Sequence, residues 1–472
     1  MGLLRWTGLL AILGLAGVGA GVLFLQSQGV TPRALAPYVE KRSAGHNGIV
    51  VGIGHWLGGS LRKLDRGDAE PYMLQAFTAG AQPVAAGSSP GAENVRLVAS
   101  VQDLRAAFAA ALPGSAITLL PGTYRIRGKV DAVRAGTASA PVRVRAVLPQ
   151  TVFIEFEATE GFLVAAPHWQ FENLTIRGVC AQPGNCEHAF HVVGAGHHFV
   201  ARNNTILDFN AHIKINGDGA AFPDHGLIEG NTLSNDAPRR TVNPVTPIDL
   251  VAASDWTIRG NLIRDFIKVD GDRISYGAFA KGAGARTLFE RNMVLCEQRF
   301  QGLPGQRVGL SFGGGATGKP FCRDRKCITE QDGGVMRANL IAACSDAGIY
   351  LNSAAASQIA DNTLLDTGGI EVRFPESSAA LDGNLVDGAI RSRNGGVLKL
   401  HDNLSSPIAY AYAGYHPVRQ LLRAPLQADY GWRGEAPRRG APATAGLDLC
   451  GSVRPAAPAY GAFEDFRPCM RP

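Results

Sequence analysis

One short phrase recurs nine times between residues 171 and 404, and it constrains the fold more than any other feature of the chain. Each copy is an asparagine followed by an apolar residue or threonine, and then by further apolar residues. The copies begin at Asn173, Asn204, Asn231, Asn261, Asn292, Asn339, Asn362, Asn384 and Asn403. Successive copies are 31, 27, 30, 31, 47, 23, 22 and 19 residues apart, and repeats of this length are typical of solenoids.

The composition of the repeats favours strands over helices. The units are rich in β-branched residues, are punctuated by Asn, Asp and Gly, and have no long apolar pattern of period 3.6. Stacked coils of this kind form an all-β solenoid, the parallel β-helix, in which each coil buries its apolar residues against its neighbours. Asparagine suits the corners, because it tolerates left-handed backbone and its amide can bond to the amide in the next coil.

The N-terminus contains an uncharged apolar run from Trp6 to Leu25, preceded by Arg5. Twenty apolar residues are enough to cross a bilayer. Because Val22 to Leu25 extends this run beyond the small residues at which a signal peptide would be cut, an uncleaved membrane anchor is predicted, with a cleaved signal and secretion as the alternative. With Arg5 on the cytoplasmic side, the prediction is a single-pass inner-membrane protein whose bulk lies in the periplasm.

These features divide the chain into four parts. Residues 1–28 are the membrane anchor or signal sequence, and residues 29–94 form a stalk with one amphipathic segment. Residues 95–404 form the β-helix, and the Pro/Ala/Arg-rich residues 405–472 form a C-terminal cover. The net charge of +6 is spread without a basic run, which argues against nucleic acid as a partner and is compatible with an acidic polymer.

The eight cysteines agree with an exported protein. Three close pairs are Cys180/Cys186, Cys322/Cys327 and Cys450/Cys469. Cys296 and Cys344 each follow a repeat asparagine by a few residues, so adjacent coils could bring them together. Disulfides in an oxidising compartment are predicted, and the spacings do not fit a zinc finger.

Candidate binding residues emerge when each coil is aligned backwards from its asparagine. The strand about 10 to 17 residues before each asparagine alternates, which sends its polar members outward and predicts one charged stripe along one face. The outward residues are His191, Lys214, Asp249, Lys281, Tyr350, Glu371, Arg373, Arg391 and Arg393. The longest step, from Asn292 to Asn339, contains an inserted charged loop with Arg307, a natural place to mount binding groups.

Both ends of the predicted solenoid carry longer motifs. An amphipathic helix over 101–112 is followed by Pro113-Gly-Ser-Ala-Ile-Thr-Leu-Leu-Pro-Gly-Thr-Tyr124 and by Gly136-Thr-Ala-Ser-Ala-Pro-Val-Arg-Val-Arg-Ala146. Near the C-terminus stand Leu449-Cys-Gly-Ser-Val-Arg-Pro455 and Pro458-Ala-Tyr-Gly-Ala-Phe-Glu464. These segments resemble the opening and closing of pectate-lyase-like right-handed β-helix proteins, and most closely the chondroitinase B and alginate lyase family. The resemblance implies a right-handed β-helix whose first coil is capped by the helix.

The same resemblance implies a lyase acting on an acidic, uronate-containing polysaccharide. In such a β-elimination a base removes the proton next to a carboxylate whose charge must be neutralised. The family uses a lysine, an arginine one coil later and usually calcium. Lys281, in Ala280-Lys-Gly, corresponds by position to that lysine, but the next coil has Leu310-Ser-Phe-Gly-Gly314 where the family has LRHG.

The candidate roles follow from this comparison. Lys281 is the base, Arg307 or Arg373 the carboxylate clamp, Tyr350 the proton donor, and Asp249 an orienting or metal-binding group with calcium as the implied cofactor. The predicted substrate-binding residues are His191, Lys214, Glu371, Arg391 and Arg393.

Two other functions stay open at this point. The missing family arginine favours a β-helix that binds polysaccharide, or serves a structural role, without cleaving anything. An epimerase or glycosidase on the same fold is the third hypothesis. It ranks last because a glycosidase needs a pair of carboxyl groups, and Asp249 is the stripe's only aspartate.

Overall fold

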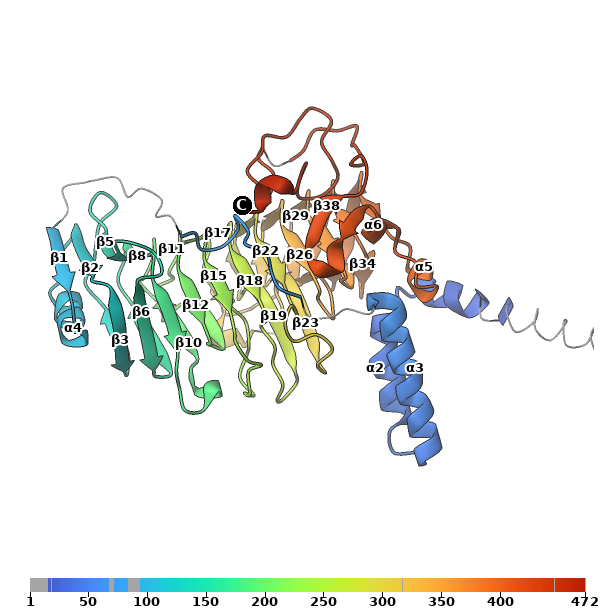
Figure 1. Ribbon diagram of the computed structural model, residues 1–472, viewed down its shortest axis with the longest axis horizontal. Helices are drawn as coiled ribbons and strands as arrows, with labels where there is room; N and C mark the ends of the chain where they lie inside the picture. The colour runs from blue at the N-terminus through green and yellow to red at the C-terminus, as the bar shows by residue number, and fades with distance from the viewer. Residues whose placement is uncertain are drawn as a thin grey trace, which may run out of the picture.

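The structure is a computed structural model that describes residues 16–17, 19–67, 72–83, 94–315, 317–444 and 446–471. Three long parallel sheets of twelve, ten and eleven strands run along the molecule (Figure 1). Between residues 115 and 405 successive strands of the chain enter different sheets, and each strand of the three long sheets pairs with its equivalent in the next coil. This is the parallel β-helix that the repeats predict.

The strands are short, and each sheet is built from one strand of each coil. The twelve-stranded sheet contains β1 (Asn94–Val98), β2 (Ser115–Leu119), β5 (Val142–Ala146), β8 (Trp169–Glu172), β11 (Val200–Arg202), β14 (Leu227–Glu229), β17 (Thr257–Arg259), β21 (Leu288–Glu290), β25 (Val335–Arg337), β29 (Ser357–Ala360), β32 (Ser378–Asp382) and β35 (Val397–His401). The ten-stranded sheet contains β4 (Val130–Ala132), β7 (Glu160–Val164), β10 (His188–Val193), β13 (Ala211–Asn216), β16 (Ile248–Val251), β19 (Ile274–Lys281), β23 (Gln306–Phe312), β27 (Ile349–Asn352), β31 (Gly369–Arg373) and β34 (Ala389–Arg393). The eleven-stranded sheet contains β3 (Gly122–Arg127), β6 (Val152–Glu157), β9 (Thr175–Gly178), β12 (Thr205–Leu207), β15 (Thr232–Ser234), β18 (Leu262–Arg264), β22 (Met293–Leu295), β26 (Leu340–Ala342), β30 (Thr363–Leu365), β33 (Leu385–Val386) and β36 (Leu404–Ser405).

The smaller elements lie at corners and in the C-terminal segment. A three-stranded sheet joins β20 (Gly284–Ala285), β24 (Gln331–Asp332) and β28 (Ala354–Ala355), and a two-stranded sheet joins β37 (Leu422–Ala424) to β38 (Asp429–Trp432). Short 3₁₀ turns occur at η1 (Pro183–Asn185), η2 (Lys319–Phe321), η3 (Pro425–Gln427) and η4 (Arg467–Cys469).

Inward side chains stack coil upon coil and form the core. In the ten-stranded sheet Phe190 is paired with Ile213, and in the eleven-stranded sheet Ile206 is paired with Leu233. These residues are fully buried and belong to one cluster that runs from Val98 to Val386. A continuous core of this kind needs no globular centre, which is why a repeat of variable length can build it.

Eight asparagines, from Asn204 to Asn403, form a ladder at the corner between the twelve- and eleven-stranded sheets. Each side-chain Nδ2 donates to the Oδ1 of the next asparagine at 2.7–3.1 Å. The predicted ninth member, Asn173, is not part of it. Leu174 occupies the ladder position in that coil and donates its N–H to Asn204. Asn173 stands one residue earlier, where its Oδ1 accepts from Asn203 at 2.8 Å.

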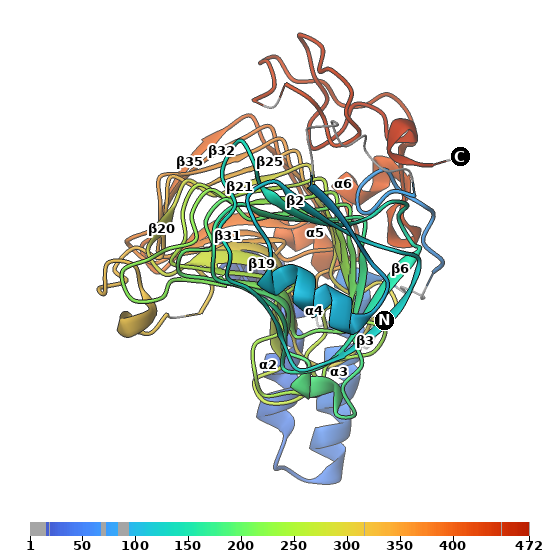
Figure 2. The same ribbon diagram turned by 90° about the vertical axis from the view of Figure 1, so that its left-hand side faces the viewer.

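The first coils are closed by α4 (Val101–Ala109), which lies across the open end of the solenoid (Figure 2). Its buried face carries Leu104, Ala107 and Phe108. The ring of Phe108 lies 5.0 Å from that of Trp169 and 5.6 Å from that of Phe162. The predicted capping helix therefore keeps water from the apolar end of the core.

A helical hairpin formed by α2 (Pro32–Ser43) and α3 (Gly48–Arg66) projects from the side of the solenoid (Figures 1 and 2). Buried ion pairs hold its base. Asp366 contacts Arg33 at 2.9 Å and Arg66 at 3.0 Å, and Arg66 also contacts Glu297 at 2.9 Å. Residues 32–66 of the predicted stalk are thus a hairpin fixed to coils that lie 231 to 333 residues further along the chain.

No helix among the described residues is long and apolar enough to cross a membrane. The prediction of a single-pass inner-membrane protein, held at the membrane by an N-terminal helix, is therefore wrong. The described residues of the apolar run are helical, the helix ends at Ser27, and a turn with Gly29 at φ 67° follows. Residues 6–15 and 18 of the predicted span lie outside the described part of the chain.

The C-terminal segment covers the outer face of the eleven-stranded sheet. It contains α5 (Ile408–Tyr412) and α6 (Pro417–Gln420), and it packs Tyr430, Phe463 and Phe466 against Leu340 and other residues of that sheet.

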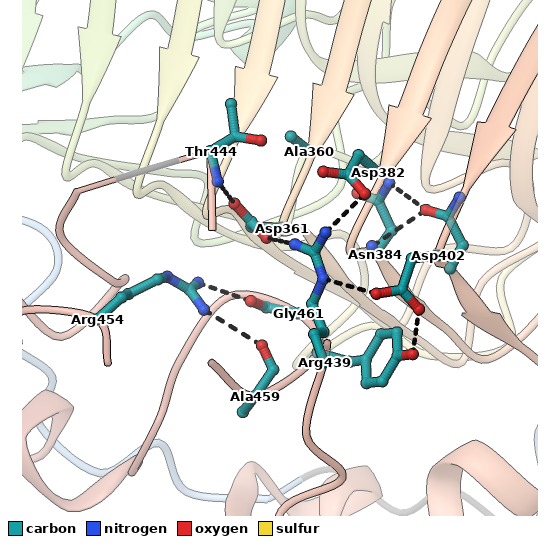
Figure 3. A network of polar contacts seen from close by, with 12 residues as sticks. Ala360, Asp361, Asp382, Asn384, Asp402, Arg439, Thr444, Arg454, Ala459 and Gly461 are labelled. Atoms are coloured by element: carbon teal, nitrogen blue, oxygen red, sulfur yellow. Dashed lines mark hydrogen bonds and ion pairs between the residues drawn. The ribbon is translucent and has the colours of Figure 1, made fainter. Parts of the chain in front are cut away.

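One arginine of this cover reaches the solenoid (Figure 3). The guanidinium of Arg439 is fully buried and contacts Asp361 at 2.7 Å, Asp382 at 2.6 Å and Asp402 at 3.3 Å. These aspartates come from three successive coils. One side chain therefore ties the cover to the last part of the β-helix.

Replacing Arg439 with methionine is expected to lower the free energy of unfolding by about 3 kcal/mol, because it leaves the fully buried carboxylate of Asp361 without its cation. The loss should appear first in the cover, as faster hydrogen exchange in residues 429–466. Urea unfolding and exchange mass spectrometry would measure both effects. Arg433→Met is a suitable control, since the charged end of that side chain donates only to the carbonyl of Arg423 at the surface. Equal losses in the two variants would contradict the proposed role of Arg439.

All eight cysteines are paired as the sequence suggested, in Cys180–Cys186, Cys296–Cys344, Cys322–Cys327 and Cys450–Cys469. The 296–344 bridge joins adjacent coils across the inserted loop and is completely buried.

Removing this bridge by a double alanine substitution is expected to cost about 2–4 kcal/mol, because it closes a loop of 48 residues in the unfolded chain. The matched control is the 322–327 bridge, which closes only five residues and should cost less. Urea unfolding of both double variants under non-reducing conditions tests the difference. A larger loss of unfolding free energy on removal of the 322–327 bridge would contradict this dependence on loop length.

Candidate functional site

The predicted polar stripe lies on the outer face of the ten-stranded sheet, but as two rows. Strand register aligns the first row across eight coils: His191, Lys214, Asp249, Phe279, Ser311, Tyr350, Glu371 and Arg391. Lys281 is paired with Val251 and stands two residues beyond Phe279, so it belongs to the second row. Asn352, Arg373 and Arg393 continue that second row. The alternation of apolar and polar residues along each strand predicts which side chains point outward. It does not predict which residues of neighbouring strands lie side by side, and so it cannot separate the two rows.

Most charges of the first row are neutralised by a neighbour. Lys214 lies 2.9 Å from Asp249, and Nδ1 of His191 lies 2.7 Å from Glu160. Glu371 contacts Arg391 and, at 3.5 Å, Arg393. The other end of Arg391 donates to the carbonyl of Gly29, so the N-terminal segment covers that end of the row.

Lys281 is different, because no described carboxylate lies within ion-pair distance of it. Its Nζ lies 4.4 Å from the centre of the Phe279 ring and donates to the carbonyl of Gly314 at 3.4 Å. Burial, with a smaller contribution from the charge of Lys214, lowers the pKa of this amine, although Asp249 opposes the shift. A half-buried lysine with a lowered pKa can be uncharged more often than an exposed one, and can then accept a proton.

The loop inserted after β23 is fixed beside Lys281. The carboxylate of Glu330 accepts from the N–H of Gly282 at 2.7 Å and from the backbone and hydroxyl of Thr317 at 2.9 and 2.8 Å. Arg323 forms a two-point ion pair with Asp224 at 2.7 and 2.9 Å. The loop therefore holds Gly314 against the lysine through contacts with two different coils.

Tyr350 and Arg373 form a second polar group on the same face. The Tyr350 hydroxyl accepts from Arg373 and from Asn352, each at 3.2 Å. Burial raises the pKa of Tyr350, so this phenol keeps its proton at neutral pH and can donate it. Arg373 stacks on Phe374 at 4.5 Å and makes no ion pair with any described carboxylate.

Arg307 does not reach this face. It is fully buried, lies 3.6 Å from Glu297, and donates to the carbonyls of Leu303 at 2.8 Å and Pro304 at 3.1 Å. Its guanidinium closes the loop before β23, so the predicted alternative of Arg307 as a carboxylate clamp does not fit the geometry.

Calcium does not fit the residues around Asp249 either. Calcium takes six to eight oxygen ligands, usually several of them carboxylates. Asp249 is nearly buried and already paired with Lys214. Among the described residues, the only group of three or more metal-binding side chains is a histidine cluster elsewhere. The predicted role of Asp249 as a calcium ligand therefore has no supporting donor set.

Two aromatic residues of this face were missed from the sequence. Phe279 fills the first row between Asp249 and Ser311, and alternation within β19 could have identified it. Tyr276 lies beside it, with ring centres 5.6 Å apart. Burial raises the pKa of Tyr276. No local pattern would have placed this tyrosine on the face.

Comparisons with known proteins agree with the architecture. No protein-family model matches the sequence, and no curated protein matches it. Among solved structures, the pectate lyase Pel9A matches with a TM-score of 0.52 and 15% identity over 76% of this chain and 90% of that one. An alginate lyase from Paenibacillus sp. str. FPU-7 matches with a TM-score of 0.40 and 14% identity over 66% and 95% of the two chains. A PL6 family polysaccharide lyase from Pseudopedobacter saltans matches with a TM-score of 0.31 and 12% identity over 66% and 92%. The chain therefore has the parallel β-helix fold of the pectate lyases.

Proposed function

We propose that the protein is a polysaccharide lyase-like enzyme that cleaves an acidic, uronate-containing polysaccharide by β-elimination on the outer face of the ten-stranded sheet. One observation carries the proposal. On a face whose other cations are paired, Lys281 and Arg373 are left without a carboxylate partner among the described residues. Unpaired, partly buried cations favour the binding of an anionic ligand.

The proposed chemistry assigns one proton movement to each group. Uncharged Lys281 takes the proton from the carbon next to the uronate carboxylate. The electron pair left on that carbon forms a double bond to its neighbour as the bond to the bridging oxygen breaks. Tyr350, still protonated, gives its proton to that oxygen. Base and acid each contribute through a positioned side chain.

Arg373 is proposed to bind a carboxylate of the polymer. Its strand lies three strands from that of Lys281, about 14 Å between backbones at the usual strand spacing, a gap that the two long side chains and one sugar unit can span. Because its guanidinium donates to the hydroxyl of Tyr350, the proposed acid, Arg373 is proposed to neutralise the carboxylate of the reacting uronate. His191, Lys214 and Arg393 extend the polar surface along the polymer.

The test is an absorbance assay for unsaturated uronate. The full-length protein, with its disulfides formed, is incubated with alginate, pectate, chondroitin and dermatan, each in EDTA and in calcium, and polymer binding is measured in parallel. We expect product from at least one polymer, at the same rate in EDTA, because the described residues around Asp249 include no calcium ligand set.

Polysaccharide binding without cleavage is the second candidate function, and one specific observation favours it. The first-row residue of β23 is Ser311, so the coil that follows Lys281 has no arginine there. If every polymer stays uncleaved while one of them binds, the face belongs to a polysaccharide-binding protein and the elimination proposal fails.

A further inference from the structure

Four histidines gather at the corner where the chain leaves the ten-stranded sheet for the twelve-stranded sheet. His168, His198 and His225 occupy equivalent places in three successive coils, before β8, β11 and β14. The rings of His168 and His198 are stacked with centres 4.6 Å apart, and the ring of His225 is tilted against that of His198 with centres 5.1 Å apart. His197 adds a fourth ring, 5.6 Å from His168 and 5.0 Å from His198.

The backbone holds these side chains in place. His168, His198 and His225 have φ values of 59°, 59° and 63°, in the left-handed region that histidine adopts more readily than most residues. The N–H of His168 donates to the carbonyl of His197 at 3.1 Å, and that of His198 donates to the carbonyl of Asp224 at 2.9 Å. Backbone hydrogen bonds between neighbouring coils therefore fix the residues that carry these rings.

The ring nitrogens of three of these histidines converge. One nitrogen each from His168, His197 and His198 lies within 4.8 Å of the other two. The Nδ1 atoms of His197 and His198 are 2.8 Å apart, which requires one of them to carry a proton and the other a lone pair. A metal ion in place of that proton could be bound by both nitrogens.

The cluster is open to solvent, since His168 and His197 are half-buried and His198 is exposed, so an ion can reach the three rings from solution. The run of histidines ends at the coil after that of His225, where the equivalent residue is Asp255. Its carboxylate lies 2.6 Å from Arg286 and 3.9 Å from His225.

We propose that His168, His197 and His198 form a binding site for a zinc ion, with a fourth coordination position left open. Tetrahedral zinc holds imidazole nitrogens at about 2.0–2.1 Å, which places them about 3.4 Å from one another. The Nδ1 atoms of His197 and His198 are closer than this, at 2.8 Å, and all three nitrogens lie within 4.8 Å of one another, so binding requires only small rotations of the side chains. The proposal is independent of the polysaccharide-lyase function.

Zinc titration of the full-length protein, purified without a histidine tag and stripped with EDTA, tests the site. We expect one zinc ion per chain with a Kd in the micromolar range or below, and a rise in Tm on zinc addition. His168→Asn and His198→Asn should weaken binding at least tenfold. Asparagine tolerates the same left-handed backbone, so these variants should fold, which circular dichroism would verify.

His46→Ala is the matched control, because that exposed histidine lies in the turn between α2 and α3, far along the chain from the cluster. It should bind zinc as the wild type does. No saturable uptake by the wild type would overturn the proposal. Unchanged affinity in folded His168→Asn and His198→Asn proteins would also overturn it.

Discussion

Replacing Lys281 with arginine is expected to slow cleavage by about 10³-fold while leaving polymer binding largely intact. Arginine keeps the positive charge and the stacking surface against Phe279, but it stays protonated and cannot accept a proton. General base catalysis contributes about 10²–10⁴-fold, so kcat should fall by about 10³-fold with little change in KM. Lys281→Met should lose both activity and part of the affinity, because it removes the cation as well.

The pH dependence of the wild type provides a second measure of the same role. Burial lowers the pKa of Lys281, and the active form is the uncharged amine. The rate should therefore rise with pH and level off below the pKa of an ordinary lysine, about 10.4. A rising limb at or above that value would mean that Lys281 is not the base.

Lys399→Arg is the control for these variants. Lys399 lies on β35, on the outer face of the twelve-stranded sheet, away from the proposed site. Its rates should match those of the wild type. If Lys281→Arg still cleaves the polymer at the wild-type rate, the base is another residue and the assignment of Lys281 is wrong.

The β-helix could be predicted from the sequence because stacked coils require equivalent residues to recur at the length of one coil. Each asparagine of the ladder must meet its equivalent in the next coil, so the copies recur at the length of one coil. The same requirement explains the failure at Asn173. The phrase looks identical there, but the amide stands one residue early, and only the register of Leu174 against Asn204 reveals it.

The site was less predictable, because it depends on the phase between coils and on distant partners. Alternation placed Lys281 outward correctly, yet its row is set by its pairing with Val251. The sequence predicted Arg307 to be an accessible charge in a polar loop. In the structure it is fully buried and contacts Glu297 and two backbone carbonyls. Similarly, the attachment of the hairpin through Arg33 and Asp366 joins residues 333 positions apart. No local pattern records such contacts.

The histidine cluster could have been predicted from the spacing of the histidines in the sequence. His168, His198 and His225 are 30 and 27 residues apart, close to the neighbouring steps of the asparagine repeat. A residue type that recurs at the length of one coil will be superposed in a solenoid. Reading the repeat for histidine as well as for asparagine would have predicted the cluster.

The largest loss of stability is expected from Asn261→Ala, in the middle of the asparagine ladder. The side-chain Oδ1 of Asn261 accepts from the backbone N–H of Asn231 at 2.9 Å and from its amide at 3.1 Å. Its Nδ2 donates to the carbonyl of Ile228 and to the amide of Asn292, both at 2.9 Å. Its Nδ2 also donates to the carbonyl of Arg259 at 3.1 Å. Alanine removes all five hydrogen bonds, and the buried backbone N–H of Asn231 and carbonyl of Ile228 in the preceding coil lose these partners.

Each buried group that loses its partner costs about 1–3 kcal/mol, so the variant should lose about 5 kcal/mol or more of its free energy of unfolding in urea. Asn403→Ala is the matched control at the end of the ladder. Asn403 accepts from Asn384 at 2.7 Å and donates to the carbonyl of Leu381 at 2.9 Å, but it is only partly buried. Water can replace its hydrogen bonds there, so the expected loss is below about 2 kcal/mol. Similar losses at both positions would mean that the ladder contributes no more inside the solenoid than at its open end.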